Sequence, residues 1–304
     1  MYASQSLHTP LDQLFSFYRK QVVVSLKPLV LEYYPDLFTQ RQDEYRKMME
    51  LSAKMTVVGH ACAEIAGFPY DARRQMIGSL FGGCCFLADS FIDDFGLDVA
   101  NSYIDRMDDL LTKGWFEIQT DREKLFYVII ARLFAERDVL DPLLRQAILL
   151  LFQAQKRDVA FRSDPESIRS RPRREQLRIL RESARNRSGH AILVLTGFLV
   201  PAVPLHYVSM IFLAGSLIMH IDDHGDCYSD YLHYHRLTYL NQVADPERTL
   251  RRIFQGHIAR LRQGLPEGSG RDLLIAFLTK YFATRLKKHR LQKTHRELAW
   301  AVYD

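Results

Sequence analysis

Residues 190–230 read HAILVLTGFLVPAVPLHYVSMIFLAGSLIMHIDDHGDCYSD, and this stretch decides the fold. Its first part, residues 190–221, holds no Lys, Arg, Asp or Glu, and two prolines divide it into two apolar pieces. The first piece is shorter than the roughly 20 apolar residues that cross a bilayer, and the second contains His206 and His220. We therefore predict two buried central helices rather than membrane spans.

The rest of the chain shows the same helical pattern. Of its 304 residues, 47% are hydrophobic and 25% are charged, which excludes a disordered or low-complexity protein. Apolar residues recur at three- and four-residue spacing, and no linker rich in Pro, Gly or Ser separates two domains. We expect helices over residues 11–27, 41–66, 71–95, 99–114, 121–137, 141–162, 173–200, 205–232, 247–263 and 270–290. The prediction is an all-α fold, a single-domain multi-helix bundle over residues 1–304.

Charge and cysteine content narrow the class of protein. The net charge of +5 is too small to indicate nucleic-acid binding. Cys62, Cys84, Cys85 and Cys227 have neither zinc-site nor disulfide-framework spacing, so we expect reduced thiols. The amino terminus lacks the basic start, apolar run and cleavage site of a secretion signal. We therefore expect a cytoplasmic protein with no transmembrane segment.

The first of two acidic clusters is DSFIDD, which follows an apolar helical run. Asp89 and Asp93 lie at i and i+4 and share one helical face, and Asp94 follows directly. Carboxylates at this spacing repel each other unless a cation compensates them. Mg²⁺ prefers carboxylate oxygens, so these residues are candidate metal ligands.

The second acidic cluster is DDHGDCYSD, which follows the uncharged stretch. Asp222, Asp226 and Asp230 lie at i, i+4 and i+8, which predicts a stripe of three carboxylates on one helical face. If the two clusters lie opposite each other at the mouth of a bundle, Mg²⁺ between them would bind a diphosphate. The expected substrate therefore carries a diphosphate leaving group.

Two basic segments supply candidate partners for that diphosphate. Residues 169–187 hold eight arginines, and those nearest the apolar helix are Arg181, Arg185 and Arg187. Arginine donates paired hydrogen bonds to phosphate oxygens, although most arginines in such a run form a solvated face. A second group near the carboxyl end contains Lys280, with Arg285, Lys287 and Lys288 as candidate lid residues.

Together, the two acidic motifs resemble those of the class I isoprenoid synthases, which include trans-prenyltransferases, squalene and phytoene synthases and terpene cyclases. DSFIDD is similar to the first aspartate motif of the squalene/phytoene synthase branch. DDHGDCYSD has the spacing of the terpene cyclase metal triad and opens like the second motif of prenyltransferases. All three ligand positions of the triad hold aspartate here, whereas cyclases carry Asn at the first, Ser or Thr at the second and Glu at the third. No Arg-Tyr pair is evident near the carboxyl end. The resemblance implies a bundle of the isoprenoid synthase type around a central apolar cavity. It is also compatible with a homodimer, because dimers are common among the proteins that this chain resembles.

The resemblance also implies a Mg²⁺-dependent terpene synthase acting on a linear allylic prenyl diphosphate. Three Mg²⁺ ions would be held by the two acidic clusters, and ionisation would release an allylic cation that cyclises or is quenched. Arg185 and Gly189 keep the spacing of the cyclase diphosphate-sensing arginine and its helix-break glycine. Aromatic rings stabilise cations. Candidate cavity-lining residues are Phe81, Phe86, Phe91, Tyr207, Phe212 and Phe282.

Three alternatives remain open at the level of the sequence. A prenyltransferase would couple the cation to a second isoprenoid or another acceptor. A His/Asp phosphohydrolase or di-iron site could be built from five neighbouring side chains, namely His220, Asp223, His224, His233 and His235. A non-catalytic helical binding protein would carry the aspartates as surface acids.

Overall fold

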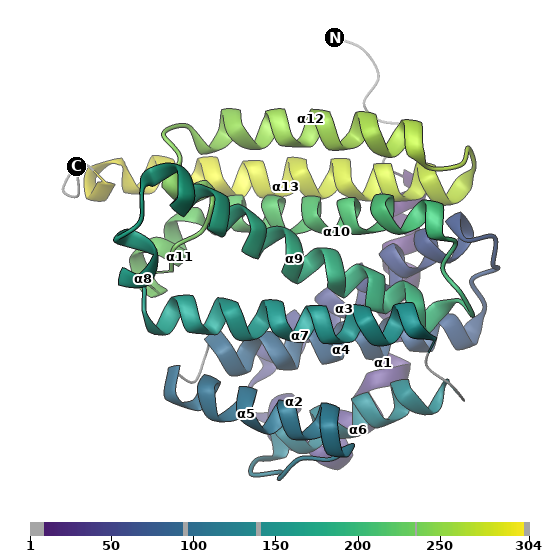
Figure 1. The fold of residues 1–304 in the computed structure, drawn as a ribbon. Helices are drawn as coiled ribbons and strands as arrows, with labels where there is room; N and C mark the ends of the chain where they lie inside the picture. The colour runs from purple at the N-terminus through teal and green to yellow at the C-terminus, as the bar shows by residue number, and fades with distance from the viewer. Residues whose placement is uncertain (1–8, 94–96, 138–140, 235, 301–304) are drawn as a thin grey trace. The chain divides into compact units, whose positions relative to one another are not determined.

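The computed structural model describes residues 9–93, 97–137, 141–234 and 236–300, and all regular structure in them is helical (Figure 1). The all-α prediction is confirmed for these residues. The α-helices are α1 (Thr9–Tyr33), α2 (Pro35–Thr39), α3 (Gln42–Ile65), α4 (Ala72–Asp93), α5 (Leu97–Lys113), α6 (Asp121–Ala135), α7 (Pro142–Ser163), α8 (Glu166–Arg169), α9 (Arg173–Leu199), α10 (Leu205–Gly225), α11 (Cys227–Tyr234), α12 (Pro246–Gly264) and α13 (Ser269–Trp300). A short 3₁₀-helix, η1 (Leu240–Gln242), precedes α12.

The contacts divide the chain into two compact units. Unit 1 comprises Met1–Arg145, Val194–Val203 and Gly268–Leu274. Unit 2 comprises Gln146–Leu193, Pro204–Glu267 and Ile275–Asp304. That the two units form a single domain around a central apolar cavity stays a prediction.

Unit 1 is built around the packing of α3 on α4, with α1 against both helices. A Cβ added to Gly82 of α4 would lie 2.3 Å from Cα of Ser52 on α3, so the close approach of these two backbones requires glycine. Buried Ser52 and Thr56 face this contact from α3, and Thr56 Oγ1 donates a 2.8 Å hydrogen bond to the Ser52 carbonyl. The first acidic cluster therefore begins on a helix that is anchored along its length.

Unit 2 contains the helix that follows the two prolines. α10 packs on α12, and α9 crosses α10 at a pair of glycines. A Cβ on Gly215 of α10 would lie 2.4 Å from the Ser188 carbonyl oxygen of α9, and a Cβ on Gly189 would lie 2.5 Å from the Phe212 ring. α9 continues without a break through Gly189, so this glycine serves close packing rather than a helix break.

Helix ends are where the sequence prediction was least accurate. α1 continues past Pro28 to Tyr33, because an interior proline removes one hydrogen bond without ending a helix that tertiary packing supports. The expected single helix over residues 205–232 is two helices, since α10 ends at Gly225 and α11 begins at Cys227. α13 extends ten residues beyond the expected end at residue 290.

The apolar helix α10 is long and apolar enough to cross a membrane by length and composition alone, and half of its most apolar window is buried within the structure. Buried core helices of soluble proteins also meet these criteria of length and composition. The expectation of a buried central helix rather than a span stays a prediction.

The four cysteines are free thiols, as predicted. Burial raises the pKa of Cys62 to about 11 and that of Cys84 to about 12. These thiols therefore stay protonated and unreactive near neutral pH.

Candidate functional site

The end of α10 places the second acidic cluster at a helix junction. Asp226, between α10 and α11, has φ −109° and ψ 6°, yet its N–H still donates to the Asp222 carbonyl at 3.1 Å. The N–H of Asp230 donates to the Asp226 carbonyl at 2.8 Å, so the four-residue ladder continues across the junction. The side chains of Asp222 and Asp226 are 39% and 26% exposed, whereas Asp230 is 7% exposed. Two of the three predicted ligands therefore reach solvent.

Three side chains of α13 meet these two carboxylates. Tyr281 Oη and Arg285 Nη2 both donate to Asp222 Oδ1, and Lys288 Nζ donates to Asp226 Oδ1. Arg285 Nη1 lies 3.5 Å from Asp226 Oδ2 and therefore bridges both aspartates. The result is a cluster of two acids, two cations and one phenol, which we call the acid–base cluster.

Helical spacing explains why α13 presents these residues together. Tyr281, Arg285 and Lys288 lie at i, i+4 and i+7, which places them on one face. Arg285 Nε also donates to Tyr281 Oη at 3.1 Å, so the structure contains a Tyr-Arg pair near the carboxyl end that the sequence analysis missed. Gly225 makes room for it, because a Cβ there would lie 2.6 Å from Arg285 Cδ.

The acid–base cluster fixes the protonation of its members. Burial, and then Asp222, raise the pKa of the Tyr281 phenol well above its usual range, so the phenol stays a donor. Burial alone would lower the pKa of Arg285, but Asp222, Tyr281 and Asp226 raise it above its ordinary value. Arg285 is therefore a permanent cation, and the two carboxylates opposite it are the compensated anions.

The residues of this cluster fit a Mg²⁺ site. Asp222 and Asp226 supply hard carboxylate oxygens that reach solvent, which is the ligand type Mg²⁺ prefers together with water and phosphate. Within the described residues, no three His, Cys, Asp or Glu side chains converge as a ready-made metal site. A two-carboxylate site completed by water and phosphate oxygens needs no such third ligand.

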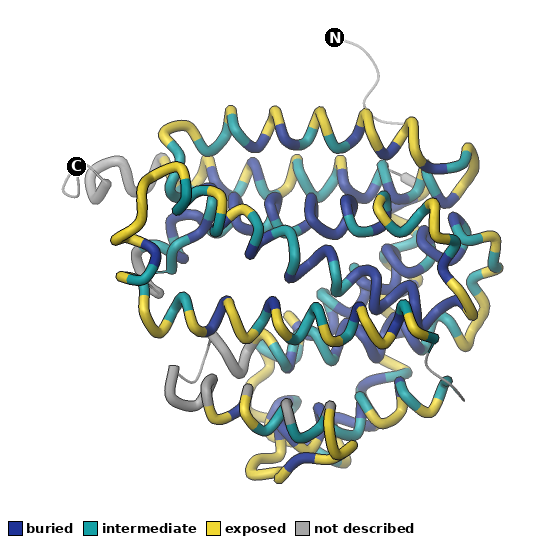
Figure 2. The backbone as a smooth tube through the Cα atoms, viewed as in Figure 1, coloured by how far each residue is buried: buried dark blue, intermediate teal, exposed yellow. Residues whose placement is uncertain are grey.

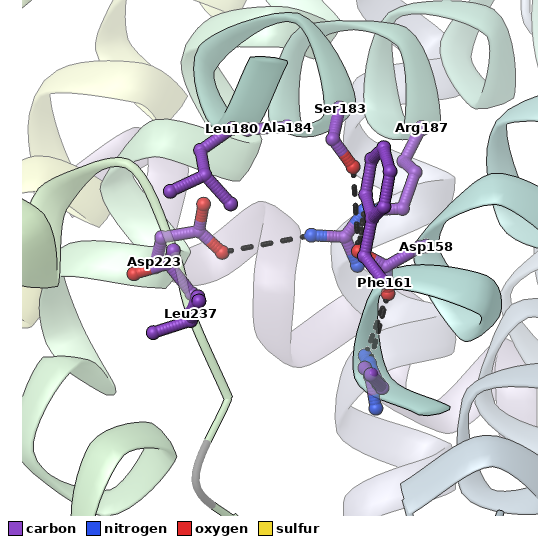
Figure 3. A pocket seen from close by; sticks show the side chains of 10 residues that line it. Asp158, Phe161, Leu180, Ser183, Ala184, Arg187, Asp223 and Leu237 are labelled. Carbon is purple, nitrogen blue, oxygen red and sulfur yellow. Dashed lines mark hydrogen bonds and ion pairs between the residues drawn. The ribbon is translucent and has the colours of Figure 1, made fainter. Parts of the chain in front are cut away.

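A second charged cluster lies deeper in unit 2, around Asp158 of α7 (Figure 3). Its carboxylate lies 2.9 Å from Arg162 Nη2, 3.4 Å from Arg187 Nε and 3.4 Å from Arg236 Nη2. Ser183 Oγ donates to it at 3.3 Å. Arg187, predicted from sequence as a diphosphate ligand, is thus buried in an ion cluster. Its Nη2 atom lies 3.8 Å from Asp223 Oδ1.

Charge and burial oppose each other in this cluster. Burial alone would raise the pKa of Asp158, but Arg187, Arg162 and Arg236 hold it well below its usual range. Burial raises the pKa of Asp223 to about 6, against the lowering effect of the arginines. The carboxyl atom Asp223 Oδ2 has no hydrogen-bond partner among the described residues. The adjoining cavity of about 10 Å³ has room for one water molecule.

The other predicted substrate contacts in unit 2 are dispersed along its helices. Arg181 is exposed, with its guanidinium 5.9 Å from the Tyr239 ring centroid. Arg185 is half-buried, and its carbonyl accepts a 3.2 Å hydrogen bond from Ser216. Lys280 is half-buried on α13, one residue before Tyr281. Whether these cations bind a diphosphate stays a prediction.

The predicted aromatic wall is distributed between the units. In unit 2, the half-buried Tyr207 ring lies 3.9 Å from the His206 ring, and Phe282 stacks on Phe254 at 4.3 Å. In unit 1, Phe86 is half-buried and Phe81 is buried. The side chain of Phe91 lies outside the described residues.

The first acidic cluster belongs to unit 1. Asp89 is exposed near the end of α4, and Asp93 is the last residue of that helix, with its side chain outside the described residues. Asp94 lies outside the described residues altogether. That this cluster joins Asp222 and Asp226 around one diphosphate stays a prediction.

Comparison of the chain with protein-family models and with curated proteins finds no match. The site must therefore be interpreted from its own residues.

The histidines considered for a phosphohydrolase or di-iron site are buried in the apolar part of unit 2. His220 and His224 are both 0% exposed, and their ring nitrogens have no hydrogen-bond partners among the described residues. The His289 ring lies 3.9 Å from that of His224. The side chain of His233 and all of His235 lie outside the described residues. Buried, unpaired imidazoles of this kind stay neutral.

We expect the neutral buried histidines to make unfolding strongly pH-dependent. Burial lowers the pKa of His220 and of His224 from 6.5 to about 3, so their stabilising contribution is complete above pH 6.5 and is lost as pH falls toward 3. Asp223 acts in the opposite direction, because the folded state takes up its proton below about pH 6. Burial also lowers the pKa of His257 to about 4 and lowers that of His289, which adds to the effect of His220 and His224, so the free energy of unfolding should fall by more than about 1.4 kcal/mol per pH unit between pH 6 and 4.

Denaturant unfolding at a series of pH values measures this slope. His220→Leu should flatten it, while His206→Gln, at an exposed histidine of the same helix, should leave it unchanged. An equal slope in the wild-type protein and His220→Leu would contradict the assignment.

Proposed function

We propose that the protein is a Mg²⁺-dependent class I terpene synthase that ionises a linear allylic prenyl diphosphate. The observation that supports this most strongly is the acid–base cluster, in which Asp222 and Asp226 meet Tyr281, Arg285 and Lys288 at one end of an apolar helix. A magnesium diphosphate carries a metal cation and anionic phosphate oxygens. The two carboxylates of this cluster match the cation, and Arg285 and Lys288 match the phosphate oxygens.

In the proposed resting state the two halves of the cluster satisfy each other. Asp222 and Asp226 would exchange these internal ion pairs for the metal of a magnesium diphosphate, and Arg285 and Lys288 would pair with its phosphate oxygens. Tyr281 remains within reach of Asp222 and orients its carboxylate. Every charge stays paired in this exchange, so neither the carboxylates nor the cations of the cluster are left without a counter-charge at a half-buried site.

Bound Mg²⁺ supplies positive charge that stabilises diphosphate as a leaving group. Arg285 and Lys288 add fixed positive charge where the leaving oxygen develops negative charge. The allylic carbon–oxygen bond breaks, and its electron pair leaves with the diphosphate. The resulting cation then cyclises, loses a proton to give a hydrocarbon or captures water to give an alcohol.

Incubation of the full chain with C10 to C25 prenyl diphosphates and Mg²⁺ tests this proposal. We expect diphosphate release together with a hydrocarbon or alcohol, and neither product when Mg²⁺ is chelated. A product that forms only when a second isoprenoid is added would replace the synthase by a prenyltransferase. Absence of diphosphate release at every chain length, with and without a second isoprenoid, would overturn the assignment to this chemistry.

A further inference from the structure

Two neighbouring helices of unit 2, α12 and α13, each carry a surplus of positive charge. α12 carries five arginines and one glutamate, and residues 275–293 of α13 carry six lysines and arginines and no acidic residue. The whole chain has a net charge of only +5, so these two stretches exceed it and the remainder of the chain is net negative. Arg285 and Lys288 pair with Asp222 and Asp226, so the surplus at the solvent surface comes from the other cations of these two helices.

The arginines of α12 occupy its solvent face. Five exposed positions alternate at helical spacing with the buried ones, as the alternating colours of α12 show (Figure 2). The exposed arginines are Arg248, Arg251, Arg252, Arg260 and Arg262. The buried residues are Leu250, Ile253, Ile258 and Leu261. The outer face of α12 is therefore a basic strip in which Glu247 is the one acidic residue.

The outer face of α13 adds apolar surface to this strip. A surface groove of about 350 Å³ is lined by Phe282, Ala283, Leu286, Lys287, Arg290 and Leu291. The Leu291 side chain is 54% exposed. The groove adjoins α12, because the Arg251 guanidinium lies 5.8 Å from the Phe282 ring centroid and Phe254 stacks on the same ring. The basic strip and the groove therefore form one continuous surface.

The other arginine-rich segment, residues 169–187, differs because three of its eight arginines pair with nearby glutamates and a fourth, Arg187, is buried beside Asp158. Arg169, Arg171 and Arg178 each form an ion pair with a glutamate three or four residues away. On α12, five arginines accompany one glutamate, and the carboxylate of Glu247 is shared between Arg251 and Arg290 of α13. The α12–α13 surface consequently keeps a positive field that an anionic partner can use.

We propose that the α12–α13 surface docks on an anionic lipid bilayer. A strip of arginine and lysine beside an exposed leucine and half-buried phenylalanine is the composition that binds at the interface of such a membrane, with cations at the headgroups and apolar side chains below them. A nucleic acid would use the cations alone and would gain nothing from Leu291. The exposed leucine within the basic surface therefore favours the bilayer.

Co-sedimentation of the full chain with vesicles tests the proposal. We expect binding to vesicles of phosphatidylcholine with about one-third phosphatidylserine, little binding to pure phosphatidylcholine, and weaker binding as salt is raised. Arg252→Glu combined with Lys287→Glu should weaken binding at least about 25-fold, since each cation near the surface contributes about 1 kcal/mol, or fivefold in affinity. Leu291→Ser should weaken it about fivefold without any change of charge.

A matched control separates this surface from total charge. Arg157→Glu combined with Arg174→Glu makes the same change of net charge at two exposed arginines of unit 2 that lie outside α12 and α13. This variant should bind the anionic vesicles within about twofold of wild type. An equal loss in the control pair, or equal binding to neutral and anionic vesicles, would overturn the proposal. So would tight binding to a duplex oligonucleotide if Leu291→Ser left vesicle binding unchanged.

Discussion

Asp226→Asn is expected to lower kcat/KM for diphosphate release by roughly 100-fold or more, because it removes a carboxylate from the proposed metal site. It should change the free energy of unfolding by no more than about 1 kcal/mol, because Asp226 is partly solvated and Asp222 continues to pair with Arg285. The loss should persist at saturating Mg²⁺. Steady-state kinetics and denaturant unfolding of the same preparation measure the two effects separately.

Glu247→Gln is the matched control for this variant. Glu247 is exposed to nearly the same degree as Asp226, at 27%, and it also pairs with two cations, Arg251 and Arg290. It lies on α12, outside the acid–base cluster. If Glu247→Gln reduces turnover as much as Asp226→Asn, the effect reports loss of a surface ion pair and the proposed site is wrong.

Asp158→Asn is expected to lower the free energy of unfolding by about 3–5 kcal/mol, the largest change in stability among the variants considered. The substitution leaves three arginines of a buried cluster without their common anion, and the side chain of Arg187 is only 5% exposed. The remaining acid, Asp223, faces only part of that cluster. Denaturant unfolding at pH 7 measures the loss.

Asp109→Asn supplies the comparison, because Asp109 forms an ion pair of the same i,i+4 type at 2.7 Å from Lys113, on an exposed helix face. An exposed pair contributes about 0–1 kcal/mol, so the control should remain close to wild type. A change below about 1 kcal/mol in Asp158→Asn would show that water reaches the cluster and compensates its cations.

How far the fold could be predicted depends on the signal at each element. The all-α class follows from sustained three- and four-residue apolar spacing, which a long helix repeats over many turns. Helix ends depend on single residues: the predicted helix over residues 11–27 ends just before Pro28, which is internal to α1, and Asp226, inside the predicted helix over residues 205–232, lies between two helices. Local propensity is weak at such positions, and packing decides the outcome.

The candidate site was only half visible in the sequence. Spacing identified Asp222 and Asp226 as neighbours on one face, but their three partners lie some 60 residues away on α13. The cations singled out there included two of these partners, Arg285 and Lys288, but not the third, Tyr281. Tyr281 could have been found from its four-residue separation from Arg285. Asp158 carried no signal, because one aspartate in an amphipathic helix resembles any surface acid until Arg187 and Arg236 are seen beside it.

The residues of α13 have a mechanical consequence. Tyr281, Arg285 and Lys288 grip α10 from one side of the helix, while Lys287, Arg290 and Leu291 occupy the side turned to solvent. An α-helix is stiff, and its residues follow one another at about 100° around the axis. A rotation of α13 caused by contacts on its outer side would therefore also move Tyr281 and Arg285, which bind Asp222. Binding of a bilayer to the outer side of α13 would thus change the contacts of Asp222 and Asp226.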